Sequence, residues 1–270
     1  MNKQLTYAAG YVLLGGALLL GVVLTWNART TIDQRVTKQE EEAKPAEIEV
    51  TLIAPSSCER CIDGNILVKE IEKQNVRLLS SQTVLSDSEE GSALIETYGI
   101  TRVPAIVIQG EYDKGIVKET LEALGGTQQD DALVIELLLP VYLDLTNNEM
   151  VGLVDVTYIT DSSCSDCYDP TQHKAILENN FGLTVQSERT VDTQSTEGRA
   201  LVEQYALKQA PTVLLSSQAL AYQRLVKAWQ EVGTQEEDGT FVFRKNAALG
   251  PVIYKNLETG ETIRPETSEE

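Results

Sequence analysis

The sequence predicts an α/β protein made of two tandem domains of the same fold, preceded by one transmembrane helix. A Cys-x-x-Cys motif occurs twice, beginning at Cys58 and at Cys164, and a proline follows each motif, at Pro104 and Pro211. The first cysteines lie 106 residues apart (58 to 164) and the prolines 107 apart (104 to 211). Repeats of roughly 20 to 50 residues are typical of solenoids, whereas a longer repeat indicates duplicated domains.

The amino-terminal segment supplies the membrane prediction. The chain has 270 residues, which suits two domains of about 100 residues with a remainder at the start. From Tyr7 to Trp26 that remainder carries no charge, and a helix of this length spans roughly the 30 Å of a bilayer core. The segment ends without a small-x-small cleavage site, and aromatic residues lie near both of its ends. We predict a stub (1–6) and an uncleaved signal-anchor (7–26), with a cleaved signal peptide or a buried core helix as alternatives.

The orientation of the anchor depends on two opposing arguments. Lys3 precedes the segment and Arg29, Arg35 and Lys38 follow it, so the positive-inside rule favours a cytoplasmic body. A very short stub before one apolar segment is the usual signal-anchor layout, and paired cysteines are most useful in an oxidising compartment. We therefore predict a single-pass cell-membrane protein with an extracytoplasmic body and the lipid bilayer as a partner.

The charge distribution excludes one class of partner. Residues 27–46 are polar and acidic and are predicted to form a flexible linker, and residues 265–270 a disordered tail. The whole chain has 41 acidic and 22 basic residues, giving a formal net charge of −19. Such a charge disfavours binding to nucleic acid.

Each predicted domain, 47–152 and 153–264, begins with a β-α-β pattern. In the first domain, Ile48–Ala54 is rich in β-branched residues and predicts a strand that ends just before Cys58. Ile66, Leu67 and Ile71 then have the spacing of one helix face, and further elements are expected at a second strand near Val76 and a helix over 93–98. A strand, a helix and a second strand in this order indicate an α/β fold.

The residues around the two prolines make the pattern specific. Val103-Pro104 and Ala210-Pro211 each open an apolar run, AIVI and TVLL. A strand leading to Cys-x-x-Cys, followed by an X-Pro that opens another strand, resembles the thioredoxin superfamily over residues 48–126 and 154–233. The resemblance implies that both X-Pro bonds are cis, which is a minority state of such bonds.

The region after each proline departs from that family. A thioredoxin-like domain has two hairpin strands between its cis-proline and its last helix, yet here the helical patterns of 117–124 and 222–232 begin early. The second hairpin strand is therefore either very short or supplied by the later segments 133–139 and 240–243. Segments 142–149 and 254–261 are similar to each other and predict a strand-turn-strand at the end of each domain.

The resemblance also implies a chemistry. A thiolate attacks a disulfide, and a second cysteine resolves the mixed disulfide that forms. The resemblance assigns attack to Cys58 and Cys164 and resolution to Cys61 and Cys167. It further implies that the backbone around Val103 and Pro104, and around Ala210 and Pro211, binds an extended substrate. We predict a thiol-disulfide oxidoreductase that acts on protein thiols and disulfides, uses a redox partner protein and needs no cofactor.

Two other uses of the cysteines remain open. Both pairs could be structural disulfides in a membrane-anchored binding module, although so short a loop removes little entropy from the unfolded chain. All four cysteines could also bind zinc. Zinc is disfavoured because the motifs lie 103 residues apart (61 to 164) and each has its own proline, so no metal site is predicted.

The two motifs differ in ways that predict unequal reactivity. Asp63-Gly64 and Asp169-Pro170 look like helix starts, which would place the cysteines before the helix and weaken its effect on their pKa. Three acidic residues lie in or near the second motif: Asp161, Asp166 and Asp169. Negative charge disfavours a thiolate, so we predict that Cys58 is the better nucleophile.

The only histidine, His173, falls on a predicted polar helix face. We predict that it is a surface residue without a role in the chemistry.

Overall fold

The structure is a computed structural model that describes residues 43–137 and 139–265. The predicted anchor over 7–26, the stub, almost all of the linker and the tail's last five residues lie outside these ranges. Within residues 43–137 and 139–265, no helix is long and apolar enough to cross a membrane.

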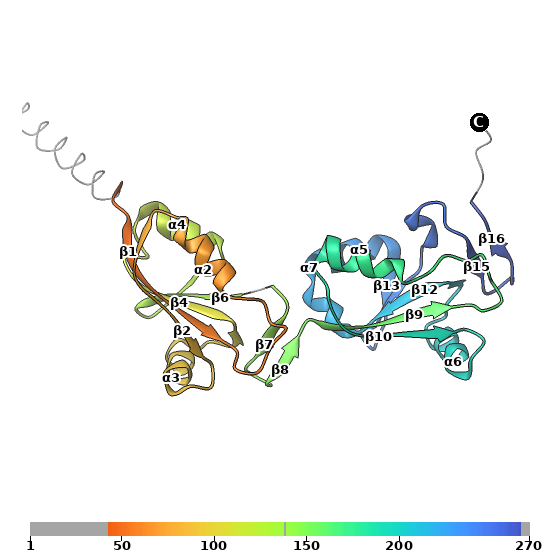
Figure 1. Cartoon of the computed structure of the whole chain (residues 1–270), viewed down its shortest axis with the longest axis horizontal. Coiled ribbons are helices and arrows are strands. Elements are labelled where there is room, and N and C mark those ends of the chain that lie inside the picture. Colours follow the sequence, from red (N-terminus) through yellow and green to blue (C-terminus); the bar gives the residue numbers. More distant parts are fainter. Residues whose placement is uncertain (1–42, 138, 266–270) are drawn as a thin grey trace, which may run out of the picture.

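The first repeat is a five-stranded mixed sheet with helices on both faces (Figure 1). Strand β1 lies inside the sheet, parallel to β2 and antiparallel to β4. The order across the sheet is β2 (Val76–Leu85), β1 (Ala46–Ala54), β4 (Ala105–Gly110), β6 (Ala132–Glu136) and β5 (Thr127–Gln129). The repeat is thus a mixed α/β unit, as the sequence predicts.

The alternation of side chains along β1 and β4 builds two cores. One face buries Ile48, Val50 and Leu52 of β1 beneath α2 (Asn65–Glu72) and α4 (Gly115–Ala123). The other face buries Ile53 and Val107 beneath α3 (Glu89–Tyr98). Because successive strand residues point to opposite faces, one strand supplies both cores.

The second repeat has the same order of strands. Its sheet consists of β10 (Thr184–Asp192), β9 (Leu153–Thr160), β12 (Thr212–Leu215), β14 (Phe241–Phe243) and β13 (Gly233–Gln235). Its helices are α5 (Gln172–Phe181), α6 (Thr196–Gln204) and α7 (Gln223–Val232), with α6 on the opposite face from the other two (Figure 1). Two short 3-10 helices, η1 (Ser217–Ala221) and η2 (Asn246–Leu249), complete it.

The later segments supply the second hairpin strand, which decides between the two alternatives left by the sequence. Ile106 of β4 faces Ile135 of β6, and Leu214 of β12 faces Val242 of β14. In each repeat a helix stands between the two paired strands along the chain. The departure from the thioredoxin pattern is therefore a change of connection, because the antiparallel neighbour of the proline strand is still present.

Helices α3 and α6 begin in the same way, which supports the duplication. The hydroxyl of Ser88 accepts a hydrogen bond from the backbone N–H of Gly91, and Ser195 does the same for Gly198, at 3.0 and 2.9 Å. A Cβ at either glycine would lie about 2 Å from a backbone oxygen, of Leu85 or Asp192. Serine caps the helix, and only glycine allows this close approach.

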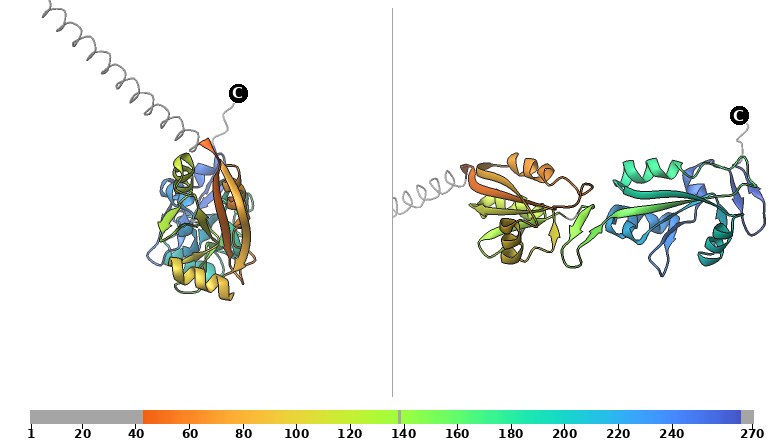
Figure 2. Two further views of the ribbon diagram at one scale, coloured as in Figure 1. Left: turned by 90° about the vertical axis from the view of Figure 1, so that its left-hand side faces the viewer. Right: turned by 60° about the horizontal axis from the view of Figure 1, so that its bottom comes forward.

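Each repeat ends in a small three-stranded sheet that contains the predicted hairpin. In the first, β3 (Arg102–Val103) pairs with β7 (Tyr142–Asp144), which pairs with β8 (Glu149–Val151). In the second, β11 (Gln209–Ala210) pairs with β15 (Tyr254–Asn256), which pairs with β16 (Thr262–Ile263). The repeats follow one another along the long axis, and the first hairpin lies between them (Figures 1 and 2).

Candidate active site

Both Cys-x-x-Cys motifs are closed disulfides, Cys58–Cys61 and Cys164–Cys167. All four cysteines are half-buried, and no other cysteine exists in the chain. Each disulfide joins the two cysteines of one motif, so the structure does not bring the two motifs together.

The disulfides lie between a central strand and the helix that follows it. Strand β1 ends at Ala54 and α2 begins at Asn65, whereas β9 ends at Thr160 and α5 begins at Gln172. The cysteines precede the helices, as predicted. Each aspartate caps the turn that leads into its helix, since Asp63 accepts from the N–H of Asn65, the first residue of α2, and Asp169 from that of Thr171, the residue before α5, both at 2.9 Å.

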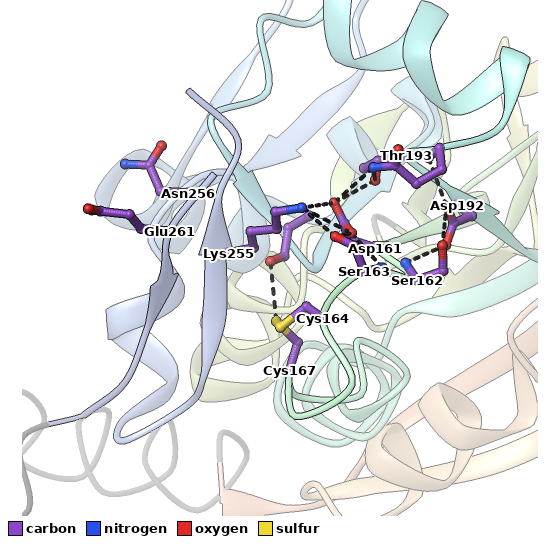
Figure 3. A network of polar contacts seen from close by, with 12 residues as sticks. Asp161, Ser162, Ser163, Cys164, Cys167, Asp192, Thr193, Lys255, Asn256 and Glu261 are labelled. Atoms are coloured by element: carbon purple, nitrogen blue, oxygen red, sulfur yellow. Dashed lines mark hydrogen bonds and ion pairs between the residues drawn. A yellow bond between two sulfur atoms is a disulfide. The ribbon is translucent and has the colours of Figure 1, made fainter. Parts of the chain in front are cut away.

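The two X-Pro bonds, Val103-Pro104 and Ala210-Pro211, are cis, as the resemblance implies. All four residues are buried. In the second repeat, Sγ of Cys167 lies 4.0 Å from the carbonyl oxygen of Ala210 (Figure 3). In the first, a Cβ on Gly64 would lie 3.2 Å from Cβ of Pro104, so the loop after Cys61 passes directly over the proline. Each repeat thus places its proline beside its own disulfide.

The backbone that the resemblance assigns to a substrate is paired within the chain. Val103 faces Leu143 of β7, and Ala210 faces Lys255 of β15. A residue just before each of these strands also accepts a hydrogen bond from the residue after the second cysteine, Val141 from Ile62 and Ile253 from Tyr168, both at 2.9 Å. The strand-like edge beside each disulfide is therefore covered in this structure.

A buried carboxylate, which the sequence indicates only as local negative charge, lies next to the second disulfide (Figure 3). Asp161 is 4% exposed and accepts hydrogen bonds from the N–H of Ser163 and the hydroxyl of Thr193, both at 2.9 Å. Lys255 Nζ lies 3.3 Å from its Oδ2. Burial raises the pKa of Asp161, but the hydrogen bonds from Ser163, Thr193 and Lys255 outweigh it and lower the pKa to about 2.

Ion pairs neutralise most of the negative charge around the second motif. Asp161 is paired with Lys255, and Asp166 is paired with Arg264 at 2.6 Å. In the first motif Arg60 donates to the carbonyl of Val185 in the second repeat, at 2.9 Å. Because two of the three carboxylates beside Cys164 are paired with cations, the charge argument for Cys58 is weaker, and the greater reactivity of Cys58 stays a prediction.

The ion pair between Asp161 and Lys255 has no counterpart at the equivalent positions of the first repeat. The position of Asp161, three residues before the first cysteine, is held there by Pro55, and Val103 faces Leu143 where Ala210 faces Lys255. Both members of the pair are replaced together. This coupled difference is the signal from which an alignment of the two repeats could have identified the pair.

We expect Lys255→Leu to destabilise the second repeat by about 2 kcal/mol, because it leaves the carboxylate of Asp161 buried without its cation. The double variant Asp161→Asn/Lys255→Leu should lose less than the single variant, because no charge then remains buried. Urea unfolding, followed by the fluorescence of Trp229 in a Trp26→Phe background, measures the free energy of unfolding of both variants. Equal losses in the single and double variants would contradict this expectation.

The prediction for His173 is wrong. Its side chain is 3% exposed and packs edge-on against Phe243, with ring centroids 4.6 Å apart. Its Nε2 lies 3.2 Å from the hydroxyl of Tyr168, which also contacts Asn246 Oδ1 and the carbonyl of Pro211 at 3.0 and 3.1 Å. Burial lowers the pKa of His173 to about 4. This cluster of Tyr168, His173 and Asn246 supports the cis-proline from inside.

A groove lies beside the first disulfide, at the junction of the two repeats. Its volume is about 580 Å³, within the usual range for ligand sites. The loop around Cys58 forms one wall, and Met150, Leu153 and Gln186 form the other. The side chain of Met150 is 43% exposed. The groove gives Cys58 an open surface.

No protein-family model matches this sequence, and no curated protein matches it. Among solved structures, the chain is similar to the alkylhydroperoxide reductase AhpF of Enterococcus faecalis, at 15% identity over 67% of this chain and 88% of that chain, with a TM-score of 0.22. It is also similar to a protein disulfide oxidoreductase from Aeropyrum pernix, at 19% identity over 68% of this chain and 82% of that chain, with a TM-score of 0.18. At these identities and TM-scores, no residue role is taken over from these proteins. The roles at the site are argued from the geometry of this chain alone.

Proposed function

We propose that the chain is a thiol-disulfide oxidoreductase that exchanges disulfides with the cysteines of other proteins. The observation that carries the proposal is the position of each half-buried disulfide, between the end of a central strand and a cis X-Pro, in both repeats. A disulfide with a purely structural role does not require a proline partner, and its three-residue spacing encloses too short a loop to stabilise the fold much.

The reaction is a pair of exchange steps. A substrate thiolate attacks Sγ of Cys58 or Cys164, the new sulfur–sulfur bond forms, and the bond within the motif breaks to leave Cys61 or Cys167 as a thiolate. A second substrate thiolate then attacks the mixed disulfide, which gives a substrate disulfide and two protein thiols. Two electrons and two protons pass from substrate to protein, and the reverse sequence reduces a substrate disulfide. A redox partner protein returns the motif to its starting state.

In the second repeat, the carbonyl of Ala210 serves the resolving cysteine. Sγ of Cys167 is 4.0 Å from that oxygen, so the reduced thiol can donate a weak hydrogen bond to it. A hydrogen bond donated by the neutral thiol disfavours its thiolate, which leaves Cys164 as the attacking group in the reduced form. Lys255, which also donates to the hydroxyl of Ser163, neutralises the negative charge of Asp161 near Cys164.

Trapping of mixed disulfides tests the proposal. In the variants Cys61→Ser and Cys167→Ser the resolving cysteine is absent, so an attacked substrate stays covalently bound to Cys58 or Cys164. We expect the remaining Cys58 or Cys164 thiolate to attack a disulfide of oxidised insulin and release one insulin thiolate, so that each variant accumulates a disulfide-linked adduct that a non-reducing gel resolves and dithiothreitol removes. Cys58→Ser and Cys164→Ser are the matched controls. Adducts that form equally through Cys61 and Cys167 in these controls would contradict the assigned roles.

We further propose that residues 7–26 anchor the protein in the cell membrane with its body outside the cytoplasm. The uncharged length of this segment and its flanking aromatic residues support the anchor. Membrane fractionation followed by protease treatment of intact cells tests both statements. Release of the protein by salt alone would contradict the anchor, and resistance of the body to protease would contradict the orientation.

A further inference from the structure

The backbone edge nearest to each disulfide belongs to the two residues before the cis-proline. In the second repeat this edge is β11, because Sγ of Cys167 lies 4.0 Å from the carbonyl oxygen of Ala210. Proteins commonly bind extended polypeptides by adding them as a strand to an open sheet edge, where main-chain hydrogen bonds supply the affinity. A polypeptide attached to Cys164 would therefore find its first main-chain partner at Ala210.

The main-chain groups of Ala210 are already paired with another strand of this chain. Ala210 faces Lys255, and two residues further along the ladder the N–H of Leu257 donates to the carbonyl of Lys208 at 2.8 Å. Hydrogen-bonded pairs in an antiparallel ladder recur at every second residue, so Ala210 and Lys255 also exchange their N–H and C=O groups. Each residue has one backbone donor, and none remains for a substrate strand on this edge.

The first repeat has the same strand pairing at the equivalent residues. The N–H of Leu145 donates to the carbonyl of Thr101 at 2.8 Å, and Val103 faces Leu143 two residues along. The arrangement is the same although the facing residues differ, leucine in one repeat and lysine in the other. What the two repeats share is therefore the strand pairing and not a side-chain contact.

We propose that the hairpin ending each repeat acts as an internal substrate strand, which restricts the disulfides to small thiols until the hairpin unpairs. The inference rests on the proposed oxidoreductase function and adds the control of substrate access to it. While β7 or β15 is paired, a low-molecular-weight thiol that needs no main-chain partner reaches the sulfur. An extended polypeptide exchanges disulfides efficiently only after β7 or β15 has left the edge.

The hairpins are suited to this exchange because they are short. Strands β7 and β15 have three residues each, and the connecting turns are largely exposed. Short elements at the end of a domain open at a lower free-energy cost than its central strands and helices. The residue after each second cysteine, Ile62 or Tyr168, donates to the chain just before β7 or β15, so a movement of that loop on reduction acts directly on the hairpin.

Two proline variants of the full-length oxidised protein test the proposal and control for each other. Leu145→Pro removes the N–H that bonds to Thr101, and Leu257→Pro removes the N–H that bonds to Lys208. The probes are a synthetic extended peptide with one central cysteine, and dithiothreitol as the small thiol. Alkylation and mass spectrometry report the reaction of each motif separately.

We expect Leu257→Pro to raise the rate at which the peptide thiol reacts with Cys164–Cys167 about tenfold, and to leave its reaction with Cys58–Cys61 unchanged. Leu145→Pro should raise the reaction at Cys58–Cys61 and leave that at Cys164–Cys167 unchanged. The rates with dithiothreitol should change less than about twofold at both motifs, because this thiol needs no main-chain partner. Peptide rates that do not rise in the variants would overturn the inference. If neither probe reacts at either motif in the wild type, the proposed function itself fails.

A measurement on the unaltered hairpins keeps the test independent of folding in the variants. In the Cys167→Ser variant, whose hairpins are unaltered and whose adducts are not resolved, the amide hydrogen of Leu257 should exchange with solvent faster when the peptide is bound as a mixed disulfide to Cys164. A cysteamine adduct at Cys164 should leave that amide protected. Equal protection in the two adducts would mean that the peptide binds without displacing the hairpin, which overturns the inference.

Discussion

Replacing Cys58 and Cys164 together by serine should lower the rate of insulin reduction by at least about 100-fold, to the rate of the reductant alone, since without the two attacking sulfurs no mixed disulfide with substrate forms at either motif. A turbidity assay of insulin with dithiothreitol as the reductant measures the rate. The variant Leu79→Ser/Leu220→Ser, which changes one exposed residue of each repeat outside the hairpins and no cysteine, is the matched control and should retain most of the activity.

The single variants Cys58→Ser and Cys164→Ser should each remove only the contribution of their own motif. Leu153, at the start of β9, lines the groove beside Cys58, whereas Cys164 follows the end of β9. The eight residues of this strand span about 26 Å, at roughly 3.3 Å per residue. Two disulfides at opposite ends of such a strand cannot exchange directly within one chain. Losses that are far from additive would contradict this independence.

Acidification from pH 7.5 to about 4 should destabilise the second repeat by about 3 kcal/mol through His173 alone. Burial lowers the pKa of this histidine from 6.5 to about 4, so the unfolded chain binds a proton in this range that the folded chain does not. Stability is therefore complete above pH 6.5 and falls as the pH decreases towards 4. Below about pH 4 both states are protonated, and this histidine causes no further loss.

Leucine at this position provides the control for His173. The first repeat has Leu67 at the corresponding position, six residues after its second cysteine, and Tyr168 would keep its contacts with Asn246 and Pro211. His173→Leu should remove about 3 kcal/mol from the difference in unfolding free energy between pH 7.5 and about 4. Trp229 fluorescence in a Trp26→Phe background reports the second repeat, because Trp229 packs on Phe243 with ring centroids 6.1 Å apart. An unchanged pH dependence in the variant would contradict the assignment.

The sequence predicts the features that depend on local pattern and on duplication. The strand before Cys58 and the terminal hairpins follow from short segments that occur twice, and the cis bond before Pro104 is implied by the resemblance that those segments carry. The later segments 133–139 and 240–243 were one of two options for the missing hairpin strand, and the structure decides in their favour through the pairing of β6 with β4 and of β14 with β12. Only long-range pairing could make that choice.

The features that the sequence did not predict arise from contacts between distant residues. His173 is buried because Phe243, 70 residues later, packs edge-on against it. Asp161 meets Lys255 across 94 residues, and its neighbours along the chain carry no sign of that pairing. The covering of the Val103 edge likewise depends on the register of β7 against β3. Periodicity does not specify contacts of this kind, and composition does not do so either.

The most direct test of the central claim is an electron count between the protein and a substrate. Oxidised full-length protein is mixed with reduced, unfolded ribonuclease, the reaction is quenched with an alkylating reagent, and the free thiols on both proteins are counted over time by mass spectrometry. We predict that two thiols appear at Cys58 and Cys61, or at Cys164 and Cys167, for every disulfide formed in ribonuclease. Two intact motifs beside fully reduced ribonuclease would contradict the claim and would identify the disulfides as structural.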